Sequence, residues 1–326
     1  MLLIAFGGPL GPADVRPFLA NVLRGRRVTP ERVDEVAHHY ELFGGVSPLT
    51  ALTRAQAAGL RERLQARGVA LPVYVGMRNW HPFLADTLAE MSAAGVRRAI
   101  GFIAAAHRSY SSCLQYRENV RDARGSLTSR GIPDIDVVYT GDWYSHPHFI
   151  AASADETVQA LQALPEAVHG QAALVFTAHS IPVSMAARYP YQEQYETTAR
   201  LIADAVRSAS GLTLPHFTVY QSRSGRPEDP WLGPDVCEFL RQGKADGRLQ
   251  AAVIVPAGFI CDHIEVLYDL DTEAAQTCRE IGLPMVRSRA VNDHPLFLDM
   301  MADVVIDVLD RYAGARPLAM AMGSSA

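Results

Sequence analysis

Short runs of apolar, mostly β-branched residues alternate with amphipathic helical patterns along most of this 326-residue chain. Such runs are typical of strands buried on both faces of a sheet, and strands separated by helices pair in parallel, because a parallel neighbour needs a crossover connection. The expected strands lie at residues 2–6, 72–77, 98–105, 135–139, 172–176, 217–220, 251–255 and 283–287. The same cycle occurs before and after Trp143. We therefore expect an α/β fold of two lobes, each a four-stranded parallel sheet flanked by helices, with a cleft between them.

The domain organisation follows from this repetition, since 326 residues are many for one hydrophobic core. We expect an N-terminal lobe at residues 1–143 and a C-terminal lobe at residues 144–293. A last helix at residues 294–312 is expected to pack back on the N-terminal lobe. Residues 313–326 are expected to form a loosely ordered tail.

Composition excludes several classes of protein. The chain is 48% hydrophobic and 20% charged, as in globular proteins, and its net charge of -5 argues against a nucleic-acid binder. It contains no apolar run of about 18 residues and no basic n-region before Gly7, so neither a membrane span nor a signal peptide is expected. Four scattered cysteines suggest neither a disulfide framework nor a zinc ribbon, which favours a reducing cytoplasm. Dinucleotide, Walker and GxSxG motifs are missing, so nucleotide cofactors are not expected.

The stretch at residues 251–273 carries the strongest chemical signal. A strand pattern is followed there by a helical pattern whose carboxylates are Asp262, Glu265, Asp269 and Glu273. The last three are spaced four residues apart, so on an α-helix they form an acidic column along one face. No basic residue occurs between Ala251 and Thr277 to relieve their repulsion. A divalent cation, held with an imidazole from His263 or elsewhere, is one explanation, and a solvated acidic face is the other.

His179 is the histidine best placed for chemistry. It follows a buried strand, and side chains at the carboxyl ends of parallel strands gather where such sheets bind ligands. A histidine there can bind a metal or accept a proton near neutral pH, or it can be a core histidine bonded to a loop carbonyl. Glu265 follows another strand of the same half, so both side chains could face one cavity. For His107, His146 and His148 we favour a structural or solvent-facing role.

Several segments closely resemble the ferrochelatase family. They are AFGGP (5–9), HYELFGGVSPL (39–49), FTAHSIP (176–182), YQSRSGRPEDPWLGPDV (220–236) and PAGFICDHIEVLYDLDTE (256–273). They span nearly the whole chain in family order. The resemblance implies two Rossmann-like lobes around a porphyrin cleft and an enzyme that inserts Fe(II), its substrate, into a porphyrin without a cofactor.

The resemblance also implies roles for particular residues. His179 and Glu265 take the paired catalytic and metal-binding positions. Asp269 and Glu273 continue the acidic column, which could pass metal inward or protons outward. The positions that line the macrocycle and its propionates in relatives acting on coproporphyrin are Arg24, Tyr40, Ser47 and Tyr116.

Departures from the family pattern refine this expectation. Some relatives carry an axial tyrosine where this chain has Phe6. Ser111-Ser112-Cys113 matches the context of one ligand to the [2Fe-2S] cluster of actinobacterial relatives, but no cysteine follows Cys278, so we expect no cluster.

The overall pattern looks closest to those actinobacterial enzymes. It favours coproporphyrin III as substrate, giving Fe-coproporphyrin III in haem biosynthesis. We expect a monomer, with other enzymes of that pathway as possible partners. The alternatives are a protoporphyrin IX ferrochelatase, a cobalt or nickel chelatase, and a porphyrin carrier without catalysis.

Overall fold

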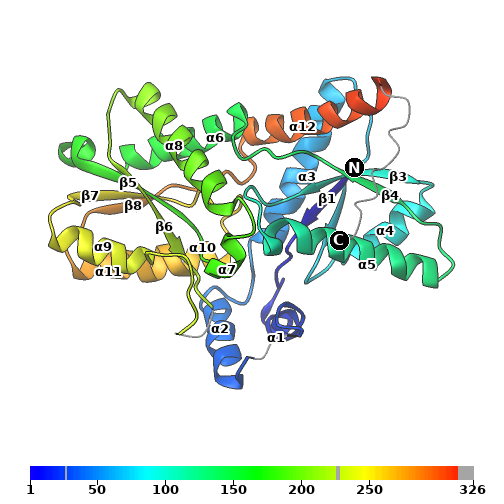
Figure 1. Ribbon diagram of the computed structural model, residues 1–326, viewed down its shortest axis with the longest axis horizontal. Helices are drawn as coiled ribbons and strands as arrows, with labels where there is room; N and C mark the ends of the chain where they lie inside the picture. Colours follow the sequence, from blue (N-terminus) through cyan, green and yellow to red (C-terminus); the bar gives the residue numbers. More distant parts are fainter. Residues whose placement is uncertain (26–27, 225–227, 315–326) are drawn as a thin grey trace.

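Two four-stranded parallel sheets form the framework of the protein (Figure 1). The computed structural model describes residues 1–25, 28–224 and 228–314. The first sheet has the order β2-β1-β3-β4 and the second the order β6-β5-β7-β8, with all neighbours parallel. The strands are β1 (Leu2–Ala5), β2 (Tyr74–Met77), β3 (Arg98–Ile103), β4 (Asp136–Tyr139), β5 (Ala172–His179), β6 (His216–Gln221), β7 (Ala251–Val255) and β8 (Met285–Arg287). The predicted two-lobed α/β fold is confirmed.

Helices cover both sheets. The α-helices are α1 (Pro12–Val22), α2 (Pro30–Leu42), α3 (Leu49–Ala66), α4 (Leu84–Ala93), α5 (Gln115–Ser129), α6 (Pro147–Gln162), α7 (Val183–Ala186), α8 (Tyr191–Ser210), α9 (Val236–Ala245), α10 (Ile264–Val266), α11 (Ala275–Glu280) and α12 (Pro295–Gly314). Two segments are π-helical, η1 (Tyr110–Leu114) and η3 (Leu267–Ala274), and η2 (Glu166–Gln171) is a 3₁₀-helix. In the part of the chain that the structure describes, no helix combines the length and hydropathy that crossing a bilayer requires.

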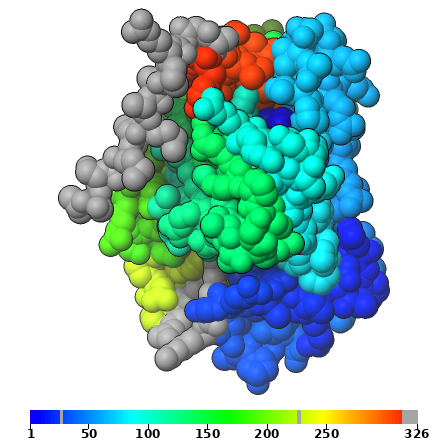
Figure 2. Space-filling view, turned by 90° about the vertical axis from the view of Figure 1, so that its right-hand side faces the viewer, coloured from blue at the N-terminus to red at the C-terminus, as the bar shows by residue number. Residues whose placement is uncertain are grey.

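The C-terminal helix α12 lies against both halves of the chain. It packs on α6 from the second half and on α3 from the first, as Figure 1 shows along the top of the molecule. An ion pair of 3.1 Å between Arg63 on α3 and Asp299 on α12 supports the second contact. Figure 2 shows the red α12 at one end of the molecule and the blue α1 and α2 at the other. The domain boundaries at 143 and 293 stay a prediction. Helix α12 continues to Gly314, two residues into the predicted tail, and the rest of that tail lies outside the described residues.

Two local features differ from the sequence prediction. Strand β5 continues to His179, three residues beyond its expected end, because its hydrogen-bonded register with β6 runs on to Gln221. The helix expected after Gly258 is α-helical only at its ends, and residues 267–274 are π-helical. Hydrogen bonds in a π-helix span five residues instead of four, and such segments are frequent at functional sites.

Candidate active site

A close approach between two neighbouring strands positions the site. The turn after β7 reaches the end of β5, where the Gly258 amide donates to the carbonyl of Thr177 at 2.9 Å. A Cβ at residue 258 would lie 2.4 Å from the Cβ of Ala178, so only glycine permits this contact. The start of α10 is thereby brought beside His179, the last residue of β5.

His179 and Glu265 face one another. The Nε2 atom of His179 lies 3.9 Å from Oε2 of Glu265, and the two side chains are 36% and 41% exposed. The other ring nitrogen, Nδ1, is hydrogen-bonded to the carbonyl of Ser180. A carbonyl can only accept, so Nδ1 carries the proton of the neutral ring and Nε2 has a free lone pair directed toward Glu265. The arrangement can therefore accept a proton or bind a metal ion.

Glu265 is held by its backbone at the N-terminus of α10. The backbone amide of Glu265 donates to Nδ1 of His263 at 3.2 Å, and its carbonyl accepts from Nε2 of Gln221 at 3.3 Å. Burial lowers the pKa of His263, with a further lowering by the nearby His179 and an opposing effect from Glu265. Because the cap bond occupies Nδ1 of His263, this imidazole serves mainly to orient the helix that carries Glu265.

The acidic column continues from Glu265 into π-helix η3. Burial raises the pKa of Asp269 to about 7, and the charges of Glu265 and Glu273 add to the rise. Hydrogen bonds from Ser222 and from Gln221, the latter 3.1 Å long, oppose it. Burial also raises the pKa of Glu273. Asp269 is therefore a carboxyl group that can take up and release a proton near neutral pH.

Asp269 and Glu273 line a hollow of about 390 Å³. Its remaining lining residues come from the end of β6, from α9 and its cap, and from α11: Gln221, Ser222, Asp235, Val236, Cys237, Arg241, Gln276, Thr277 and Glu280. Carboxylate, amide and hydroxyl oxygens predominate among these groups. Such a surface suits a hydrated divalent cation or a chain of water molecules that moves protons.

Asp262, by contrast, is a structural acid. Arg287 pairs with it at 2.7 Å and binds Asp271 with two further hydrogen bonds of 2.6 and 2.8 Å. This arginine lies on β8, beyond the stretch from Ala251 to Thr277 that lacks a basic residue, and so was not predicted as the partner of Asp262. Asp262 therefore fixes the start of the segment that carries Glu265 and is no part of the acidic column.

Two buried tyrosines lie near the charge of Glu265. Tyr40 is 8% exposed and Tyr116 5% exposed. Burial raises the pKa of both hydroxyls, and the charge of Glu265 adds to the rise. Arg78 opposes it at Tyr116, and its guanidinium lies 5.0 Å from the centre of that ring and 5.5 Å from the ring of Phe6. The charge of Glu265 thus acts on both tyrosine hydroxyls.

The other two predicted substrate-binding residues are Ser47 and Arg24. Ser47 is 4% exposed and packs against Gly8, where its hydroxyl oxygen accepts from the Leu49 amide at 3.4 Å. Arg24 is exposed just after α1, and its guanidinium donates to Asn21 at 2.7 Å. None of these contacts is with His179 or Glu265. Ser47 and Arg24 can therefore bind the substrate only if the ligand extends from that pair to them.

Three groups at the site had no role predicted from the sequence, although Arg78 was expected at the ligand-binding edge of its sheet. Gln221 and Ser222 bind Asp269, and Arg78 lies between Phe6 and Tyr116. All three lie at the carboxyl end of a strand, so the rule that singled out His179 applies to Gln221 and Ser222 as it does to Arg78.

Comparison with known proteins adds to this geometry. Residues 1–309 match the family model described as ferrochelatase. The chain is 45% identical over 334 residues to the coproporphyrin III ferrochelatase of Streptomyces griseus, covering 99% of this chain and 89% of that enzyme. It is 45% identical over 310 residues to a ferrochelatase of Rhodopirellula baltica, covering 95% of this chain and 86% of that protein.

Solved structures share the fold at low sequence identity. The sirohydrochlorin chelatase SirB from Bacillus subtilis subspecies spizizenii, in complex with cobalt, aligns with a TM-score of 0.55 at 10% identity, covering 96% of both chains. CbiX, described as the terminal enzyme of sirohaem biosynthesis in denitrifying bacteria, aligns with a TM-score of 0.52 at 14% identity, covering 94% of this chain and 97% of that one. At these identities the likeness concerns the fold alone.

Proposed function

The chain belongs to the ferrochelatase family, and on this premise we propose that it inserts Fe(II) into coproporphyrin III to give Fe-coproporphyrin III in haem biosynthesis. Curated relatives that carry the name coproporphyrin III ferrochelatase, 40 to 45% identical over most of their length, support this choice of substrate. The observation that carries the mechanism is the 3.9 Å approach of His179 Nε2 to Glu265 Oε2.

Metal insertion exchanges two pyrrole N–H protons for one Fe(II) ion, so the site must accept protons as well as meet the metal. In our proposal His179 uses the lone pair of Nε2 for one of these tasks, since Nδ1 holds its proton against Ser180. Glu265 supplies negative charge, which stabilises either a protonated imidazole or the incoming cation. Nitrogen and oxygen ligands of this kind suit Fe(II).

The acidic column gives the second half of the proposal. Asp269 has a pKa of about 7, so it can receive a proton released at the reaction centre and pass it on. Glu273 lies next along the helix and lines the same hollow. We propose that this hollow exchanges protons, metal ions or both between water and the His179–Glu265 pair.

Coproporphyrin III carries four carboxylates, and the groups proposed to contact it are Arg24, Tyr40, Ser47 and Tyr116, to which we add Arg78. Arg78 is partly exposed, and the rings of Phe6 and Tyr116 hold its guanidinium. A guanidinium fixed in this way can bind a carboxylate with little loss of side-chain freedom.

The experiment that tests the substrate is anaerobic Fe(II) insertion into coproporphyrin III and protoporphyrin IX, measured side by side with the same enzyme preparation. We expect kcat/KM to be higher for coproporphyrin III by about tenfold or more, the effect of at least one additional charged hydrogen bond. Equal or faster insertion into protoporphyrin IX would favour the alternative substrate. Binding of either porphyrin without insertion would indicate a carrier.

The proposal also covers the location, oligomeric state and partners of the enzyme. A cytoplasmic location suits a water-soluble tetracarboxylate substrate, and cell fractionation tests it. We also propose a monomer that could deliver its product to other enzymes of the pathway. Sedimentation of the purified protein, alone and with such enzymes, tests both statements.

A further inference from the structure

Helices α6 and α12, which pack against each other, begin in the same way. Each is preceded by a histidine and starts with proline, as His146-Pro147 in α6 and His294-Pro295 in α12. In both, Nδ1 of the histidine accepts a hydrogen bond of 3.2 Å from the backbone amide two residues later. The two histidines therefore cap their helices identically.

The two helix starts are also linked reciprocally. Nε2 of His294 bonds at 3.0 Å to Asp155 on α6, and Nε2 of His146 approaches Asp303 on α12 at 3.7 Å. Each aspartate follows the histidine of its own helix by nine residues. At the His294 end, the result is a simple histidine–aspartate pair that joins the two helices.

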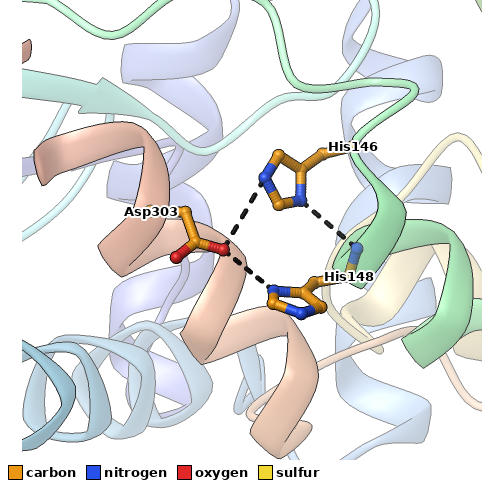
Figure 3. A group of neighbouring side chains, drawn as sticks. All are labelled: His146, His148 and Asp303. Carbon is orange, nitrogen blue, oxygen red and sulfur yellow. Dashed lines mark hydrogen bonds and ion pairs between the residues drawn. The ribbon is translucent and has the colours of Figure 1, made fainter. Parts of the chain in front are cut away.

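The His146 end differs by one side chain. Two residues after the cap, α6 has His148 where α12 has Leu296. Nδ1 of His148 lies 2.9 Å from the same Asp303 oxygen that His146 approaches (Figure 3). The additional imidazole turns a pair into a cluster in which one atom from each of the three residues lies within 4.8 Å of the others.

We propose that His146, His148 and Asp303 bind a divalent transition-metal ion of the Zn(II) class, at a site separate from the His179–Glu265 pair. Two imidazoles and one carboxylate are a donor set that such ions accept, with a further position left for water. Donors about 2.0–2.1 Å from a tetrahedral metal lie about 3.3 Å apart. The separations of 2.9 and 3.7 Å from the Asp303 oxygen lie on either side of this value.

Some neighbouring groups favour metal binding at this site and others oppose it. Burial lowers the pKa of His146, which keeps the ring neutral and able to bind a metal, although Asp303 acts in the opposite sense. Arg67, the residue that follows α3, pairs with the other oxygen of Asp303, so the carboxylate is oriented but its charge is shared. Binding through Nε2 of His146 moves the ring proton to Nδ1 and gives up the helix-cap bond. The bound ion would join α6 to α12 and, through Asp303 and Arg67, to α3.

The test uses His148→Leu, which gives the start of α6 the leucine that α12 has at the same position, Leu296. The matched control is His294→Ala. The full-length protein, without a polyhistidine tag and without porphyrin, is dialysed against Zn(II) to count the bound equivalents. We expect His148→Leu to weaken the binding of one equivalent of Zn(II) by about 100-fold or more, since it removes a direct ligand. His294→Ala should retain this equivalent.

Two further measurements separate this site from the catalytic pair and from a change in folding. The double variant His179→Ala/Glu265→Gln should still bind one equivalent of Zn(II) at the site that His148→Leu disrupts. Zn(II) should raise the thermal unfolding midpoint of the wild type and of His294→Ala but not that of His148→Leu. Equal Zn(II) binding by wild type and His148→Leu, or loss of all bound Zn(II) in the double variant, would overturn the proposal.

Discussion

Asp269 should make the stability of this protein depend on pH between about 4 and 7. Its pKa is raised by burial from an ordinary 3.8 to about 7. In that pH range the folded protein keeps a proton that the unfolded chain has lost. The free energy of unfolding therefore falls as the pH rises and levels off above the folded pKa. At about 1.4 kcal/mol per pH unit, the total loss is at most ~4 kcal/mol.

Asp269→Asn removes this titration while retaining an oxygen that can accept from Gln221 or Ser222. We expect the variant to match the wild type near pH 4 and to be more stable by ~2 to ~4 kcal/mol at pH 8. Urea unfolding of metal-free protein at pH 5, 6, 7 and 8 gives the difference directly. Asp134→Asn is the control, because hydrogen bonding to Arg124 lowers the pKa of Asp134 and leaves it ionised over this range. A stability difference between wild type and Asp269→Asn that does not change with pH would show that the pKa of Asp269 is not raised in the folded protein.

Two further predictions concern the groups that position the site. Gly258→Ala forces a Cβ to within 2.4 Å of the Ala178 Cβ, and should cost about 1–3 kcal/mol in urea unfolding and slow Fe(II) insertion. Gly125→Ala, with no atom within 4 Å of the added Cβ, should neither lower the unfolding free energy nor slow Fe(II) insertion. Equal losses in the two variants would contradict the steric argument. Arg287→Met leaves the Asp262 carboxylate, 14% exposed, without its cation and should lower the unfolding free energy by about 3 kcal/mol. A loss below about 1 kcal/mol would show that Asp262 does not depend on this partner.

The parts of the fold that were predictable from sequence are those encoded locally. The apolar run at 251–255 and the breaker residues after it define β7 to the residue. The prediction that His179 and Glu265 would meet followed from their places after two strands of one sheet. It needed only the rule that parallel strands end at the same edge.

The parts that were not predictable depend on contacts between distant segments. A spacing of four residues between acids is compatible with an α-helix, and nothing local to residues 267–274 indicated a π-helix. Gln221 reaches Asp269 only because β6 ends beside the helix that follows β7, which requires the strand order. His146 and His148 were expected to be structural or solvent-facing, since Asp303 is 155 residues beyond His148 and the packing of α6 on α12 was unknown.

The most direct test of the central claim measures insertion and binding together in His179→Ala and Glu265→Gln. We expect Fe(II) insertion into coproporphyrin III to slow by about 100-fold or more in each variant, because each loses a proton-transfer or metal-binding group. The porphyrin dissociation constant should stay within about threefold of the wild-type value, a difference of ~0.7 kcal/mol. Insertion at the wild-type rate in either variant would contradict the assignment of this pair as the reaction centre.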